Sequence, residues 1–385
     1  MGDKQPNSDN KKQQSCFFDD LIIQEILTRL PIKSIIRFKS VSKQWYSTLS
    51  SSNFANAHLI KSPFSHPSAP VDTLLIKCGN NFYLSSCDDD QISGNFQNNL
   101  VKLDAAFGVE ENSFRLIGCC NGLICLTLTH DNYFIIWNPA THKMHKYESD
   151  GYLNGIDFSG LSIVVRGFGY ASSVDDYKYV LIVYMPRENE KGNIVHIFSL
   201  KEKKWRKIDF DHDMVIPEGG AVLVNEKLYM IAFLRIDFGS RLVVVSFDLG
   251  LETFEITNKF NIDGLDILGV MGGCLSIING YTQNPFMHIQ ESPTTMKSIC
   301  LPKELCLINL SSEIIGFTKS GKCFVTAPVS DDNFWDSPSR ELWLVDTVTK
   351  PMGYSMLMKE DEGLNIVQYV PSLVSPFPVE ELSEA

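Results

Sequence analysis

The sequence predicts a chain of mixed class, α+β by domain, with a small all-α unit over residues 16–61 and an all-β propeller over residues 71–376. Near the N-terminus, apolar residues recur at the spacing of an α-helix. From Val71 onward, short runs rich in Val, Ile, Leu, Phe and Tyr are separated by Gly, Asn, Asp and Ser. These runs repeat at intervals of roughly 40–60 residues, which is typical of propeller blades. We predict six blades, with seven as the alternative.

The helical unit follows a polar segment, residues 1–15, which we expect to be a disordered tail. Asp19 suits the N-cap of a first helix. Pro31 ends that helix and suits the first position of a second one. Ser42 suits the N-cap of a third helix, so the unit is predicted to contain two or three short helices.

This helical unit is both small and strongly apolar. Roughly 45 residues bury too little surface to be comfortably stable alone, and the unit has more large aliphatic side chains than a three-helix core needs. Each such side chain left exposed forgoes roughly 1.5–3 kcal/mol of burial. We therefore expect a docking element that a partner or the rest of the chain completes. The alternative is a helical cap on a larger domain.

A segment rich in Pro and Ser, residues 62–70, is predicted to be a linker between the helical unit and the β-rich region. After it, one element recurs: a strand that ends in a polar turn. Four copies lie at residues 136–143, 197–205, 246–254 and 344–350. Each copy predicts the third strand of one blade and the turn that follows it.

Two further units bring the count of blades to six. They are a weaker copy around His288 and the opening strands over residues 72–103. The segment 365–374 then remains as a single strand, and we expect it to complete the first blade so that the ring has no open edge. Residues 377–385 are predicted to be a tail.

Three tryptophans, Trp137, Trp205 and Trp343, recur near the predicted blade turns. Large aromatic side chains bury much apolar surface. We therefore expect them to pack between adjacent blades, with contact to a partner as the alternative.

The composition is that of a soluble globular protein. The 385 residues carry a net charge of −12 and are 44% hydrophobic. No run approaches the roughly 20 apolar residues that span a bilayer, and residues 1–8 contain no apolar signal region. The 10 cysteines, at irregular spacings, are expected to be reduced and mostly buried. We expect a protein of the cytoplasm, the nucleus or both.

The acidic balance disfavours nonspecific binding to nucleic acid or to an anionic membrane. It suits a basic protein partner. Carboxylate clusters in predicted loops could form an acidic rim for such a partner, although solvated turns explain most of them. These clusters lie at residues 88–90, 110–111, 331–332 and 360–362.

The motifs in the sequence do not predict catalysis or a cofactor. Gly167-Phe168-Gly169 imitates half of a dinucleotide loop but lacks the third Gly, and we expect it to form a turn between strands. His142 and His145, with three nearby cysteines, have no second ligand pair at metal-site spacing. The chain also has no Gly-x-Ser-x-Gly sequence. We therefore expect no catalytic, cofactor-binding or metal-binding residues.

One register from Asp19 to Trp45 matches a known motif at many positions, among them Asp19-Asp20-Leu21, Leu30-Pro31 and Val41-Ser42-Lys43. It resembles an F-box, the module that binds the Skp-family adaptor of cullin-RING ubiquitin ligases. The family usually opens with Leu-Pro, where this chain has Phe17-Phe18. Phe18 lacks the fixed φ of proline, so we expect weaker or shifted adaptor contact at that point.

Several stretches of the β-rich region also match a known domain. They lie at residues 120–126, 137–141, 167–170, 175–178, 246–249 and 372–376. These stretches resemble the F-box-associated domain of plant F-box proteins, which is related to Kelch-type propellers. The closing Tyr-Val-Pro-Ser-Leu-Val-Ser-Pro run is similar to S-locus F-box and S-locus-like members, and related F-box proteins with other targets end similarly.

The resemblance implies the non-catalytic substrate-recognition subunit of an SCF-type cullin-RING ubiquitin ligase. The F-box would bind a Skp-family adaptor and, through it, a cullin. The propeller would hold a target protein for ubiquitination and degradation. The residues expected to form the adaptor-binding face are Leu21, Ile22, Ile26, Leu27, Leu30, Pro31, Ile35, Phe38, Val41 and Trp45.

Two other functions are compatible with a propeller. A propeller enzyme or a ligand- or sugar-binding module would need a polar central pocket lined by ligand- or metal-binding groups. An interaction scaffold would bind a partner whose lifetime does not depend on cullin activity.

Overall fold

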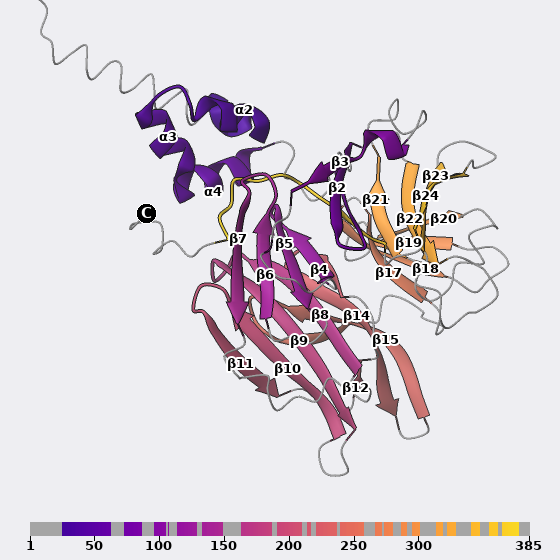
Figure 1. Ribbon diagram of the computed structural model, residues 1–385. Coiled ribbons are helices and arrows are strands. Elements are labelled where there is room, and N and C mark those ends of the chain that lie inside the picture. The colour runs from indigo at the N-terminus through magenta and orange to yellow at the C-terminus, as the bar shows by residue number, and fades with distance from the viewer. Residues whose placement is uncertain are drawn as a thin grey trace, which may run out of the picture.

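The chain combines a small helical unit with a ring of β-sheets, and the helices lie at one side of the ring (Figure 1). The computed structural model describes residues 25–62, 73–86, 96–104, 107, 114–128, 133–148, 163–186, 191–209, 214–216, 221–236, 239–257, 266–271, 273–279, 286–290, 295–300, 313–318, 322–328, 340–346, 354–360 and 364–376. The predicted N-terminal tail, most of the linker and the C-terminal tail lie outside these residues.

Within residues 25–62, the helical unit contains a short 3₁₀ turn and three α-helices. They are η2 (Leu27–Arg29), α2 (Ile32–Phe38), α3 (Lys43–Ser50) and α4 (Ser52–Lys61). Ser42 caps α3 as predicted, because its hydroxyl accepts a hydrogen bond from the Trp45 amide at 3.1 Å. Pro31 stands one residue earlier than predicted, at the N-cap of α2, with an extended ψ of 144°.

The first three blades are four-stranded antiparallel sheets. Blade 1 contains β1 (Thr73–Cys78), β2 (Asn81–Ser86) and β3 (Val101–Leu103), with the 3₁₀ turn η3 (Phe96–Asn99) before β3. Blade 2 contains β4 (Phe114–Cys120), β5 (Leu123–Leu128), β6 (Tyr133–Asn138) and β7 (Lys143–Glu148). Blade 3 contains β8 (Ile163–Ala171), β9 (Asp176–Pro186), β10 (Lys191–Ser199) and β11 (Lys204–Asp209).

Blades 4 to 6 repeat the same antiparallel order, and the inner strand of blade 4 is split into two pieces. Blade 4 contains β12 (Met214–Val215), β13 (Val222–Val224), β14 (Lys227–Ile236), β15 (Gly239–Asp248) and β16 (Phe254–Thr257). Blade 5 contains β17 (Asp266–Met271), β18 (Cys274–Asn279), β19 (Phe286–Gln290) and β20 (Met296–Cys300). Blade 6 contains β21 (Glu313–Phe317), β22 (Lys322–Pro328), β23 (Arg340–Asp346) and β24 (Tyr354–Glu360).

The C-terminal strand β25 (Asn365–Gln368) closes the ring. It pairs with β1 in an antiparallel register that places Leu75 opposite Val367. β25 therefore completes blade 1, as the sequence predicted, and is its innermost strand. The inner strands contact one another in the order β25, β4, β8, β13, β17 and β21, and β21 contacts β25 again. The prediction of six blades is confirmed.

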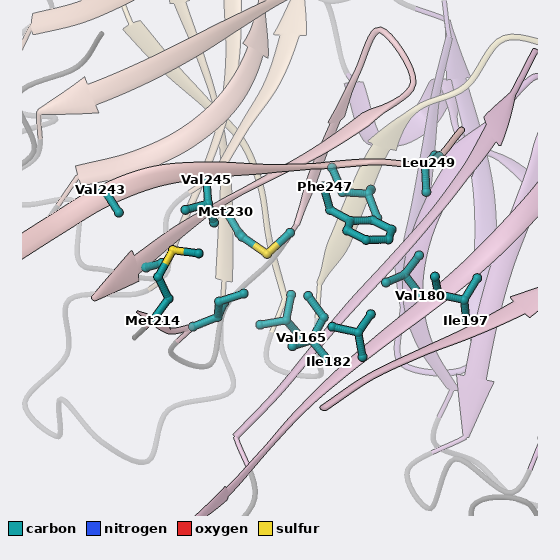
Figure 2. Close-up of a cluster of buried hydrophobic side chains, with 14 of the residues drawn as sticks. Val165, Val180, Ile182, Ile197, Met214, Met230, Val243, Val245, Phe247 and Leu249 are labelled. Carbon is teal, nitrogen blue, oxygen red and sulfur yellow. The ribbon is translucent and has the colours of Figure 1, made fainter. Parts of the chain in front are cut away.

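Between successive blades lie buried apolar clusters, so the core of the ring is divided among the blade interfaces. In the interface between blades 3 and 4, Val180 and Ile182 face Met230 and Val245 (Figure 2). Middle strands bury both faces, because each supplies side chains to two interfaces; all of β5 is buried. This explains why the middle strands are continuous apolar runs in the sequence.

The three tryptophans pack between blades as expected. Trp137 of blade 2 meets Phe82 of blade 1 with ring centroids 5.3 Å apart. Trp205 of blade 3 meets Phe134 of blade 2 at 6.2 Å. Trp343 packs against the cluster shared by blades 5 and 6.

The Gly167-Phe168-Gly169 motif lies within strand β8, and the prediction that it forms a turn is wrong. The reason is close packing with the next blade. A Cβ atom at Gly167 would lie 2.5 Å from Leu228, and one at Gly169 would lie 2.6 Å from Leu249. These glycines let blades 3 and 4 approach each other.

Candidate functional site

The helical unit has a compact core of its own. Its buried members are Leu27, Ile32, Ile35, Leu49, Phe54, Ala55 and Leu373. All but the last come from the helices, and Leu373 comes from the C-terminal segment of the chain. Phe38 and Trp45 are half-buried at the edge of this core, where their rings meet edge-to-face at 5.9 Å.

Polar contacts hold the ends of the unit together. The buried His58 side chain of α4 places Nε2 2.8 Å from the carbonyl oxygen of Leu30. Burial lowers the pKa of His58, so the neutral ring is favoured. On the surface, Glu25 accepts from Lys61 at 3.2 Å and from Arg29 at 3.3 Å. The hydrogen bond and charge of Lys61 lower the pKa of the Glu25 carboxyl most, and Arg29 lowers it further.

The residues predicted to form the adaptor-binding face do not all lie on the surface. Leu27 and Ile35 are 3% and 0% exposed and belong to the core of the unit. Their predicted part in adaptor binding stays a prediction. Leu30 is half-buried at the edge of that core together with Phe38 and Trp45. Leu21 and Ile22 lie outside the described residues.

Other predicted residues do lie on the surface. Ile26 is 53% exposed, Val41 is 61% exposed, and Pro31 is also exposed. Two apolar residues that the sequence reasoning left out join them: Ile36 at 41% and Tyr46 at 61% exposure. We refer to Ile26, Ile36, Val41 and Tyr46 as the exposed apolar set.

The sequence contained a signal for these two omissions. Neighbours on a helix point about 100° apart, so Ile35 and Ile36 point in different directions, and only Ile35 lies in the core of the unit. The same holds for Trp45 and Tyr46, of which Trp45 packs inward. Assigning each pair to two directions would have identified Ile36 and Tyr46.

One side of the helical unit rests on the ring. Ala140, in the turn between β6 and β7, packs against the core of the helices. Leu59 of α4 packs against the cluster between blades 2 and 3. Burial lowers the pKa of Lys39 at the end of α2, and the positive charge of Lys143 on β7 lowers it further. The helices are therefore sealed on the side of blade 2.

A second candidate site is a cleft of about 350 Å³ between the turns of blades 3 and 4. Lys178, whose side chain is 2% exposed, donates to Glu252 at 2.6 Å and also bonds the carbonyl oxygen of Leu249. Arg206 pairs with the same Glu252 carboxylate. The positive and negative side chains that line the cleft pair with one another. These ion pairs join blade 3 to blade 4.

Other groups weighed for chemistry have ordinary surroundings. Burial, together with the charge of Cys120, raises the pKa of the Cys119 thiol to about 12, so Cys119 is not a thiolate nucleophile near neutral pH. His145 packs on Tyr147 with centroids 4.4 Å apart. Within the described residues, no three His, Cys, Asp or Glu side chains gather as a metal site would need. The carboxylate clusters predicted to form a rim fall on undescribed residues, Glu360 excepted.

The described part of the chain also contains no helix with the length and apolar content that crossing a bilayer requires.

Comparison with known families matches both parts of the chain. Residues 18–56 match the F-box domain, and residues 74–267 match the F-box associated beta propeller domain. The second match runs from β1 through β16 and reaches β17, so it omits β25 of blade 1.

Individual relatives agree with this result. F-box protein CPR1 of Arabidopsis thaliana is 28% identical over 291 residues, which cover 68% of this chain and 66% of the relative. An F-box/kelch-repeat protein of the same plant is 27% identical over 267 residues, covering 67% of this chain and 70% of the relative. Another F-box protein of that plant is matched over 58% of its length. The matched part of the chain thus spans between 58% and 70% of the length of these three relatives.

Solved structures give only a distant likeness. A chain of a nidogen–laminin complex has a TM-score of 0.42 at 9% identity, over 78% of this chain and 98% of that chain. A hypothetical selenium-binding protein from Sulfolobus tokodaii has a TM-score of 0.39 at 10% identity, over 81% and 99%. The family matches are sufficient: the chain belongs to the F-box proteins that carry an F-box-associated β-propeller domain.

Proposed function

We propose that this protein is the substrate-recognition subunit of an SCF-type ubiquitin ligase, in which the helical unit binds a Skp-family adaptor. The exposed apolar set carries the proposal. Its four large apolar side chains, each 41% exposed or more, lie within the residues that match the F-box domain, and Ile60 of α4, 82% exposed, lies just after them. Covering such side chains gains roughly 25 cal/mol per Å² of apolar surface.

The two sides of the helical unit fit this role. One side rests on blade 2 through Ala140 and Leu59, so it is not free for a partner. The exposed apolar set is therefore the surface offered to the adaptor. Leu27 and Ile35 support that surface from inside by fixing the helices, and Phe38 and Trp45 lie at its half-buried edge.

The propeller would hold the target protein, and the adaptor would connect the chain to a cullin. F-box proteins are typically non-catalytic subunits. Holding a target near a ubiquitin-charged enzyme requires no active-site residues in the protein that binds the target. The net charge of −12 favours a target with a basic surface. Such a subunit would need no cofactor and would act in the cytoplasm, the nucleus or both.

The experiment is a binding titration of a purified Skp-family adaptor against the full chain and a Val41→Asp variant. Val41 is 61% exposed, so the substitution places a charge on the surface without making a cavity. Burying that charge in the interface is costly, and we expect the affinity to fall at least about tenfold.

The matched control is Leu251→Asp, the same kind of change at a residue that is 76% exposed on blade 4. It should bind the adaptor as tightly as the unsubstituted chain. Equal affinity of all three proteins, with equal melting temperatures, would refute the proposed adaptor surface.

A further inference from the structure

The segment after β25 leaves the ring and crosses to the helices. The Tyr369 amide still donates to the carbonyl of Thr73 at 2.9 Å, as part of blade 1. Beyond it, the yellow C-terminal segment passes beside α4 and β7 (Figure 1). We call residues 369–376 the strap.

Blade 2 anchors the strap with hydrogen bonds. Asn138, at the end of β6, is 0% exposed, and its amide nitrogen donates to the carbonyls of Ser372 at 3.0 Å and Val374 at 2.7 Å. Tyr147 of β7 donates its hydroxyl to the carbonyl of Pro376 at 2.8 Å. A buried amide that bonds two carbonyls fixes the path of the chain, because either acceptor left without a donor would cost stability.

Neighbouring residues of the strap enter different cores. Val374 is 7% exposed and joins the cluster between blades 2 and 3. Leu373 is 8% exposed and joins the core of the helical unit. Successive side chains of an extended segment point in opposite directions, so the bonds from Asn138 aim Leu373 at the helices.

We propose that the strap makes adaptor binding conditional on the closed ring. A helical unit of roughly 45 residues buries too little surface to be comfortably stable alone, and Leu373 supplies a core side chain from the opposite end of the described chain. Helices without it fold only part of the time, and the apparent affinity for the adaptor falls in proportion to the folded fraction. Asn138 is the positioning residue, because it holds Leu373 in place. This inference rests on the proposed function.

The test compares full-length variants by hydrogen–deuterium exchange and by adaptor affinity. Leu373→Ala truncates the side chain that the strap contributes to the helical core, and Leu373→Met keeps the volume of that side chain. Leu275→Ala makes a similar cavity in the ring between blades 4 and 5, at a residue that is 3% exposed. Exchange needs no adaptor, so it reports on the strap even if the proposed function fails.

We expect Leu373→Ala to speed exchange of the α2–α4 amides at least about tenfold and to weaken adaptor binding by the factor by which the folded fraction of the helices falls. Leu373→Met should stay within about twofold of the unsubstituted chain on both measures. Leu275→Ala should speed exchange in blades 4 and 5 and leave both the helices and the affinity unchanged.

Tyr147→Phe serves as a milder variant, since it removes the bond to Pro376 without making a cavity. It should shift both measures in the same direction by a smaller factor. The strap proposal is overturned if the helices of Leu373→Ala exchange at the rate of the unsubstituted chain. If the unsubstituted chain does not bind the adaptor, the proposed function is overturned, and the exchange rates still decide whether the strap completes the helices.

Discussion

At the scale of single residues, Gly122 and His196 each have a local requirement that leads to a testable prediction. Gly122 has a φ of +74°, in the left-handed region, and a Cβ atom there would lie 2.7 Å from the backbone nitrogen of Ser372. Glycine is needed at this position for two reasons, the positive φ and the close approach of the strap.

Gly122→Ala should therefore lower the free energy of unfolding by about 2–4 kcal/mol, through left-handed strain and the clash with the strap. Urea unfolding measures the loss. Gly118→Ala is the control, because its Cβ would meet its nearest neighbour, the carbonyl oxygen of Phe168, at an ordinary 3.8 Å. That variant should be neutral or slightly stabilised, and equal losses in the two variants would contradict this explanation.

His196 predicts a pH dependence. It is 7% exposed on β10, and burial, followed by the charge of Lys207, lowers its pKa from 6.5 to about 4. The unfolded chain therefore binds a proton near pH 6.5 while the folded chain does not, and stability falls as the pH drops from about 6.5 toward 4. Between pH 7 and pH 5 this one group should cost about 2 kcal/mol.

Replacing His196 by Leu removes that titration and keeps the buried site apolar. Urea titrations at both pH values should show a loss on acidification that is about 2 kcal/mol smaller in the variant than in the unsubstituted chain. An equal loss in the two proteins would assign the acid sensitivity to other groups.

At the scale of elements, local signals decide where the helices begin. Ser42 ends the turn after α2, and its hydroxyl accepts the Trp45 amide at 3.1 Å. Ser42→Ala should destabilise α3 by about 1 kcal/mol. Hydrogen exchange of the first α3 amides measures the effect. Ser47→Ala, an exposed change within the same helix, should leave that exchange nearly unchanged.

The sequence allowed much of the fold to be predicted, because each blade repeats one local pattern. The strands of the blades, the turns between them and the closing segment 365–374 could be predicted from the periodicity of apolar residues and from the turn residues. Gly167 was wrongly predicted to lie in a turn. Its lack of a side chain is required by the close approach of Leu228 from the next blade, which its own segment does not indicate. The predicted adaptor-binding face included Ile35 and left out Ile36, whereas Ile35 is buried and Ile36 is exposed. The role of Leu373 depends on contact between distant ends of the chain, which a single sequence does not encode locally.

At the scale of the whole molecule, β25 removes an open edge. Without it, the backbone groups of β1 that now pair with residues 365–368 would be unpaired. Such an edge invites pairing with other chains. Deletion of residues 364–385 should therefore give soluble oligomers or aggregates in light scattering after size-exclusion chromatography. Deletion of residues 377–385 alone should leave the elution of the full chain unchanged, and identical elution of both truncated chains would contradict the role assigned to β25.

The molecule as a whole presents a helical unit with one side on the ring and another side exposed. The most direct test is hydrogen exchange of the full chain with and without a purified Skp-family adaptor. The account predicts protection in the segments around Ile36, Val41 and Tyr46, and no change in the strap or in blades 3 to 6. Protection confined to the propeller, or release of the strap when the adaptor binds, would contradict it.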